Sequence, residues 1–216
     1  MKLVIDHLTR YGYDEEVKFS TQYLRLTPRS TGRQTITSWT LTLPEGAAVT
    51  TTDAWGNVLH VLTLDNPHKE IAIRASGIVD IAEDSEQSDV AEEELLSPLV
   101  YLRCTPLTRA DDRIREFAQR LYRRDEPEES LNQLMADLLL RMPYSPGATQ
   151  VQDSAADAFA RAKGVCQDHT HVFLACCRAL EIPARYVSGY VYSDNAQHVA
   201  MHAWGRGVGE RTLAIF

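Results

Sequence analysis

The chain has 216 residues, enough for one large domain or two small ones, and its 44% hydrophobic and 24% charged residues exclude a disordered chain, a collagen or a coiled coil. Lys and Arg total 22 against 30 Asp and Glu, and the net charge of −8 argues against a broad nucleic-acid surface. No apolar run of roughly 18 residues is present and Leu3–Ile5 is too short for a signal-peptide core, so we expect a cytoplasmic protein without a membrane span.

The first 82 residues have the pattern of β-structure. Turn-forming clusters of Gly, Pro, Asn and Asp separate short segments that alternate with period 2 or are rich in Thr, Val and Ile. The predicted strands are residues 17–26, 34–43, 58–64 and 71–81. Short strands at this spacing predict a β-sandwich domain over residues 1–82.

An acidic segment follows. Residues 75–102 contain eight acidic side chains and no basic one. Such a segment repels itself and has little to bury, so residues 83–100 are predicted to be a solvated linker or long loop.

Beyond residue 100 the spacing of the apolar residues becomes helical. Apolar side chains at i, i+3, i+4, i+7 and i+8 predict two amphipathic helices, around residues 114–122 and 131–139. Ser154 and Asp157 have the spacing of a capping box and predict the start of a third, short helix.

A fourth helix and a small sheet are expected to complete the chain. The helix is predicted from about Cys166 to Leu180, and it ends before a proline. The expected strands are residues 184–192, 199–204 and 212–216. Helices followed by an antiparallel sheet make residues 101–216 a second domain, and the whole chain is predicted to be α+β.

Cys166 is the candidate nucleophile. It stands at the start of the fourth helix, where backbone N–H groups and the helix dipole favour negative charge and therefore a thiolate. Its own N–H could face an oxyanion, and Gly164 leaves room for a substrate chain. The alternative is a buried, inert cysteine.

The other three cysteines are predicted to be packing residues. Cys176 and Cys177 lie in the middle of the helix, and no pattern in the sequence predicts a partner for Cys104. The spacing of the four does not resemble a disulfide framework.

His202 is the candidate general acid and base. It alternates with apolar neighbours on a predicted strand, and a helix-start cysteine with a later strand histidine is the pair that thiol catalysis needs. A third group should orient the imidazole. The alternative is a purely structural histidine.

A zinc site is a rival interpretation for Cys166, His169 and His171. Residues at i and i+3 share a helix face, but i+5 lies about 140° away. A fourth ligand would have to be Cys104 or His198, and no paired ligand motif supports the site.

Several motifs together resemble the bacterial transglutaminase-like superfamily. They are Lys163–Asp168, His171, Arg178–Tyr190, His202–Trp204, the lead-in Tyr144–Thr149 and, near the N-terminus, Leu24–Arg29, Gln34 and Trp55–Asn57. The resemblance implies a papain-like transglutaminase core at residues 101–216, preceded by the β-rich domain often found before it. Members of the superfamily include cysteine proteases.

The resemblance also implies roles for individual residues. Cys166 would be the nucleophile and His202 the acid/base, with no metal and no cofactor. Tyr144, Gln167 and Trp204 are weaker candidates for contact with substrate or an oxyanion.

Other matched residues are expected to serve the scaffold. Asp168 is interpreted as a cap or dipole partner of the fourth helix. Arg178, Arg185 and Tyr186 are expected to fix the fold. Glu181 stands where the motif usually has glycine.

One element of the pattern is missing from the sequence. The orienting Asp of the family would fall just beyond Phe216, so the chain is interpreted as C-terminally truncated or as diverged there. The glycines after Trp204 are also unusual for a strand.

The leading functional hypothesis is a cysteine protease or amidase that acts on a protein or peptide substrate through a thioester. The alternative is a catalytically impaired transglutaminase-like module with a binding or structural role.

Overall fold

The computed structural model describes residues 1–82, 96–191 and 201–207, and these fall into two compact units. The β unit comprises residues 1–82 together with Leu96, and the helical unit comprises residues 97–191 and 201–207. Each unit has its own hydrophobic core. Within the described ranges, no helix has the length and apolarity needed to span a bilayer.

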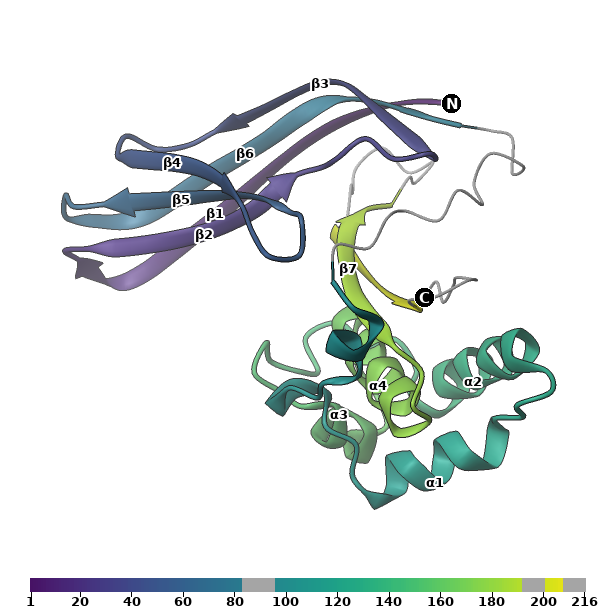
Figure 1. The fold of residues 1–216 in the computed structure, drawn as a ribbon. Helices are drawn as coiled ribbons and strands as arrows, with labels where there is room; N and C mark the ends of the chain where they lie inside the picture. Colours follow the sequence, from purple (N-terminus) through teal and green to yellow (C-terminus); the bar gives the residue numbers. More distant parts are fainter. Residues whose placement is uncertain (83–95, 192–200, 208–216) are drawn as a thin grey trace. The chain divides into compact units, whose positions relative to one another are not determined.

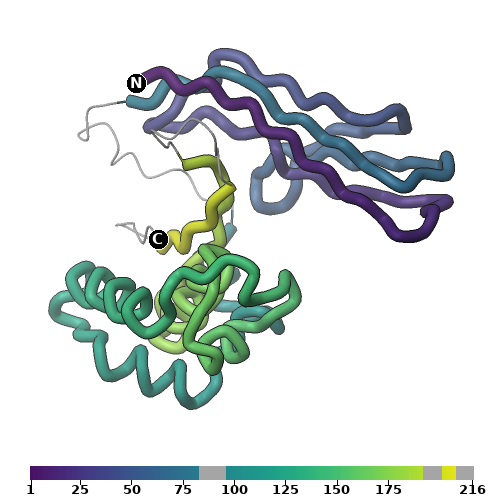
Figure 2. The backbone as a smooth tube through the Cα atoms, turned by 180° about the vertical axis from the view of Figure 1, so that it is seen from behind, coloured from purple at the N-terminus to yellow at the C-terminus, as the bar shows by residue number. Residues whose placement is uncertain are grey.

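The β unit consists of two three-stranded antiparallel sheets (Figures 1 and 2). One sheet has the order β1 (Lys2–Val17), β6 (His68–Ile81), β3 (Gln34–Thr42), and the other has the order β2 (Ser20–Thr27), β5 (Val58–Leu64), β4 (Ala47–Thr52). Leu62 and Leu64 from one sheet share a core with Ile71 and Ile73 from the other. Two sheets that bury their facing sides together form the predicted sandwich.

Two strands of the sandwich were not predicted from the sequence. β1 and β4 are each at an outer edge of a sheet. Every residue of β4 is exposed, and β1 carries large apolar side chains such as Val4 on its exposed face. The sequence of β4 therefore has no alternation to reveal it, and in β1 the apolar residues fall on both faces, Leu3 and Ile5 on the partly buried face and Val4 and Leu8 on the exposed one.

The helical unit follows the predicted order. It contains the 3-10 helices η2 (Pro98–Leu102) and η3 (Pro106–Thr108), the helices α1 (Asp112–Leu121), α2 (Pro127–Arg141), α3 (Ala155–Arg161) and α4 (Cys166–Ala179), and the antiparallel strands β7 (Ala184–Tyr190) and β8 (Met201–Gly207). Ser154 and Asp157 form the predicted reciprocal capping box at the start of α3. The expected strand at residues 212–216 and most of the predicted acidic linker, residues 83–95, lie outside the described residues.

Helix α4 is the centre of the helical unit. The other three helices surround it, and β7 and β8 pack against it (Figures 1 and 2). All ten residues from Asp168 to Cys177 are buried, as expected for a helix that is covered on every side.

Glycine at position 205 permits the close approach of β8 to α4. A Cβ at Gly205 would lie 2.7 Å from Cδ1 of Phe173. The glycines that seemed unsuited to a strand therefore include one that the helix–strand packing requires.

Arg178 fastens α4 to its surroundings, as predicted. Its guanidinium donates hydrogen bonds to the carbonyl oxygens of Tyr101 and Ala184, each at 3.1 Å, and to the hydroxyl of Thr108. One side chain thus joins α4 to η2, η3 and β7.

Candidate active site around Cys166

Cys166 is the first residue of α4 and is only partly buried. The preceding residue, Val165, has extended backbone dihedral angles and no capping side chain. Val165 therefore offers no side-chain acceptor to the first N–H groups of the helix, and these groups favour a negative charge at the helix start.

A buried carboxylate fixes the backbone that leads into Cys166. Oδ2 of Asp168 accepts a hydrogen bond from the Val165 N–H at 2.8 Å and another from the Thr149 hydroxyl at 2.6 Å. The side chain of Asp168 leaves no space for a Cβ at Gly164, which would lie 2.7 Å from the Asp168 Cβ. The predicted capping role of Asp168 is confirmed, while the contribution of Thr149 was not foreseen.

The segment that contains Tyr144 runs alongside the same loop. Tyr144 forms an isolated parallel bridge with Gly164, and the Ser145 N–H donates to the Gly164 carbonyl at 2.8 Å. The side chain of Tyr144 is 63% exposed. Its backbone therefore supports the site, whereas a role for its side chain in substrate contact stays a prediction.

Gln167 makes a contact that competes with its predicted role. Its side-chain amide donates to the Val151 carbonyl at 3.2 Å. The nitrogen that could have faced a substrate oxyanion is thus engaged by the backbone.

His202 lies on β8 opposite Gly189, and its ring meets the Trp204 ring edge-on at a centroid distance of 5.0 Å. Ala203 is buried and Gly205 meets α4, so these two residues face the helix. Because side chains alternate along a strand, His202 and Trp204 lie on the other face of β8. The pairing of His202 with Cys166 stays a prediction.

Two residues near Cys166 were given no catalytic role from the sequence. Tyr186 on β7 is the partner of Gly205 in the sheet register, and its ring lies 5.7 Å from the His171 ring at an angle of 47°. Burial, together with negative charge at Cys166 and Asp168, raises the pKa of Tyr186 to about 12. For His171 the direction is opposite: burial lowers its pKa, although the negative charge of Asp168 acts to raise it.

The sequence signal for these two residues is weak. Tyr186 and His171 are far apart along the chain and come together only through the packing of β7 against α4. Both lie within the motifs that carry the family resemblance, which is where such a pair could have been sought.

Comparisons with known proteins identify the family. Residues 3–80 match the bacterial transglutaminase-like N-terminal region, and residues 115–208 match the transglutaminase-like superfamily. An uncharacterised protein of Mycobacterium leprae is 30% identical over 224 aligned positions, which cover 95% of this chain and 80% of that protein. The chain belongs to the bacterial transglutaminase-like family.

Further relatives agree with this assignment. An uncharacterised protein of Mycobacterium bovis is 27% identical and is matched over 88% of this chain and 66% of its own length. The crystal structure of "a putative cysteine protease" from Cytophaga hutchinsonii aligns with a TM-score of 0.76 at 22% identity, over 98% of this chain and 74% of that one. The structural likeness establishes the two-part fold, with the transglutaminase core after the β-rich region.

Among the described residues, the histidines beside Cys166 do not assemble with other side chains as zinc ligands, and His198, a proposed fourth ligand, lies outside the described residues. Nε2 of His169 is 2.6 Å from the carbonyl oxygen of Met142, in the buried interior. Within residues 1–82, 96–191 and 201–207, no three His, Cys, Asp or Glu side chains are grouped so as to hold a metal ion.

The remaining cysteines differ in their environments. Cys176 and Cys177 are buried, and burial raises the pKa of both thiols, that of Cys177 to about 12. Cys104 is exposed, so its prediction as a packing residue is wrong. It lies in the short connection between η2 and η3.

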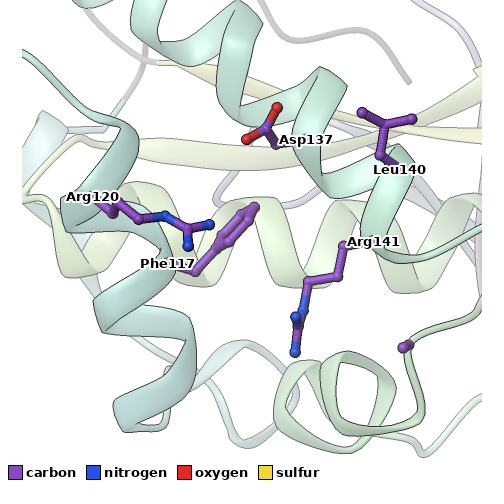
Figure 3. Close-up of a pocket in the computed structure, with 6 residues that line it drawn as sticks. Phe117, Arg120, Asp137, Leu140 and Arg141 are labelled. Atoms are coloured by element: carbon purple, nitrogen blue, oxygen red, sulfur yellow. The ribbon is translucent and has the colours of Figure 1, made fainter.

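A pocket of about 460 Å³ lies elsewhere in the transglutaminase core. It is lined by Phe117, Arg120, Asp137, Leu140, Arg141 and Ala162 (Figure 3). The guanidinium carbon of Arg120 lies 5.7 Å from the Phe117 ring centroid. Neither Cys166 nor His202 lines this pocket, so it is separate from the candidate active site.

Proposed function

We propose that the chain is a cysteine hydrolase of the transglutaminase-like type, which cleaves peptide or carboxamide bonds in a protein or peptide substrate. The observation that carries the proposal is the placement of Cys166 as the first residue of the buried helix α4. The buried Asp168 carboxylate accepts a hydrogen bond from the backbone immediately before Cys166 and another from the Thr149 hydroxyl.

In this reaction the Cys166 thiolate attacks the substrate carbonyl carbon. The C=O electron pair moves to oxygen, and the resulting oxyanion faces the backbone N–H groups at the start of α4. His202 gives a proton to the leaving amine, and a thioester remains on Cys166. Water then releases the acid, with His202 accepting the proton of that water; an amine in place of water would give transamidation.

The alternative is a catalytically impaired module. It is favoured by the position of His202, which shares a strand face with Trp204 and not with the residues that contact α4. Without a histidine that reaches Cys166, turnover would be slow even if the thiol remained reactive.

The experiment compares the parent chain with Cys166→Ala. Fluorescein-labelled casein reports hydrolysis, and incorporation of a fluorescent primary amine into casein reports transamidation. We expect turnover by the parent, none by Cys166→Ala, and unchanged turnover by Cys104→Ser, which removes an exposed thiol outside the site. Absence of both activities in the parent chain would favour the impaired module.

A further inference from the structure

The face of β7 that packs against α4 presents an aromatic side chain to the N-terminal half of that helix, which begins at Cys166. Ala184 is buried on this face, and Tyr186 follows two positions later on the same face. Opposite Tyr186 stands Gly205, which has no side chain to cover it. Tyr186 is 39% exposed, so a substrate can reach it.

His171 supports the Tyr186 ring from α4. It is 7% exposed, and its ring lies against that of Tyr186 at a 5.7 Å centroid distance. Among the residues that the structure describes, its buried Nδ1 has no hydrogen-bond partner. Because a buried orphan N–H is rarer than a buried orphan acceptor, we place the proton of the neutral imidazole on Nε2. A neutral ring in this position holds Tyr186 without adding charge to the site.

The hydroxyl of Tyr186 keeps its proton at neutral pH. Burial, reinforced by the negative charges of the Cys166 thiolate and the Asp168 carboxylate, raises its pKa to about 12. A phenol that keeps its proton serves as a hydrogen-bond donor and not as a base.

We propose that Tyr186 is a further catalytic residue, which donates a hydrogen bond to the carbonyl oxygen of the acyl group that Cys166 attacks, and that His171 is the positioning residue that holds its ring. The inference rests on the proposed function. As the S–C bond forms, the C=O π electrons move to oxygen, and the Tyr186 O–H stabilises that charge without giving up its proton. Collapse restores the C=O bond and expels the leaving group.

The other side-chain donors predicted for this role are less well placed. The Gln167 amide already donates to the Val151 carbonyl, and the Tyr144 side chain is largely solvated. Tyr190 lies further along β7, and burial alone raises its pKa, without a contribution from Cys166. Tyr190 is therefore the matched control for Tyr186.

The experiment uses two reagents that react with Cys166 by different routes. p-Nitrophenyl acetate acylates the thiolate through a tetrahedral oxyanion and releases p-nitrophenolate. Iodoacetamide alkylates the same thiolate at a saturated carbon, and no oxyanion forms. Both rate constants are measured on the full chain with Cys104→Ser, so that Cys166 is the accessible thiol.

Tyr186→Phe keeps the ring and removes the donor. We expect acylation to slow by about 10- to 100-fold while alkylation changes by less than about twofold. Tyr190→Phe should change neither rate. His171→Leu should lower the ratio of acylation to alkylation, whereas a merely structural role would slow both reactions equally.

The outcomes separate this inference from the proposed function. Equal acylation by Tyr186→Phe and the parent would overturn the role of Tyr186, and so would a parallel fall in both rates. If the Cys166→Ala variant released p-nitrophenolate as fast as the parent, the nucleophile itself would be wrong and the proposed function would fail with it.

Discussion

Protonation of the buried His171 imidazole is unfavourable, and no described residue accepts a hydrogen bond from its Nδ1. Asp168 and Arg178 are the charged groups that act on it, and they act in opposite directions. Burial is the largest effect and lowers its pKa. The folded chain therefore disfavours a charged imidazole at this position, which the unfolded chain accepts freely.

The first prediction concerns the pH dependence of stability. The pKa of His171 is lower in the folded than in the unfolded chain, so its contribution is fully present above about pH 6.5 and is lost as the pH falls through the folded pKa. We expect the free energy of unfolding to fall more steeply between pH 7 and pH 5 in the parent than in His171→Leu. The difference in slope is at most about 1.4 kcal/mol per pH unit.

Urea denaturation of both proteins at several pH values measures this difference. His7→Ala, in the β unit, is the control, because it leaves the helical unit unchanged. Parallel slopes for parent and His171→Leu would show that His171 is not buried as a neutral group.

Helix α4 ends in a tight hydrogen-bonded turn that carries a non-glycine residue. The Ile182 N–H donates to the Cys177 carbonyl at 2.8 Å and the Glu181 N–H to the Arg178 carbonyl at 3.2 Å, which is the Schellman pattern. Glu181 has φ of 61°, the left-handed conformation that glycine adopts without strain. Glu181, which stands where the family usually has glycine, therefore has a locally strained backbone conformation.

The second prediction is that Glu181→Gly stabilises the chain by about 0.5–1 kcal/mol, because relief of the left-handed strain exceeds the extra chain entropy of glycine. Chemical denaturation measures it. Glu181→Ala removes the same charge but keeps a Cβ, so it should give no comparable gain. A gain from Glu181→Ala equal to that from Glu181→Gly would assign the effect to charge.

The third prediction tests the packing of β8 on α4. Gly205→Ala places a Cβ against the Phe173 ring and should destabilise the chain by about 1–3 kcal/mol. Gly12→Ala is the control. Gly12 also lies in a strand, but a Cβ added there has no atom within 4 Å, so this substitution should change the free energy of unfolding little. Adding Phe173→Leu to Gly205→Ala should cost less than the two separate losses combined, because the smaller side chain removes the clash. Additive losses would mean that the two residues do not meet.

At the scale of the whole molecule, the helices and strands that could be predicted are those with a repeating or local signal of their own in the sequence. The four helices could be predicted because each has an apolar spacing or a capping signal of its own, as Ser154 has for α3. β1 and β4 could not, since neither has apolar residues on one face and polar residues on the other.

The same division holds for the candidate site. Cys166 could be predicted because a helix start and a glycine two residues earlier are local features. Tyr186 could not, because its place depends on the register of β7 with β8 and on how closely the sheet packs against His171. Cys104 lies in a connection without apolar periodicity, so its exposure could not be predicted from the sequence.

The fourth prediction compares the four cysteines in one experiment. Iodoacetamide at pH 7–8 should label Cys104 and Cys166 in the folded chain. Cys176 and Cys177 should stay unlabelled, because they are inaccessible and burial raises the pKa of both thiols. Peptide mass spectrometry before and after unfolding in urea measures each site. Rapid labelling of Cys177 in the folded chain would contradict the central position of α4.

The same labelling decides whether His202 acts on Cys166. A nearby imidazolium favours the thiolate, so His202→Ala should slow Cys166 alkylation at pH 6.5 by about tenfold and leave it within about twofold at pH 9.5, where the thiolate forms without help. Cys104 in the same sample is the internal control and should not change. If Cys166 alkylation at pH 6.5 is equally fast in the parent and in His202→Ala, His202 does not activate the thiol. The start of α4, with the backbone that Asp168 fixes before it, would then activate the thiol without His202. The chemistry would then need another proton donor for the leaving amine, and the impaired module would become the better description of the chain.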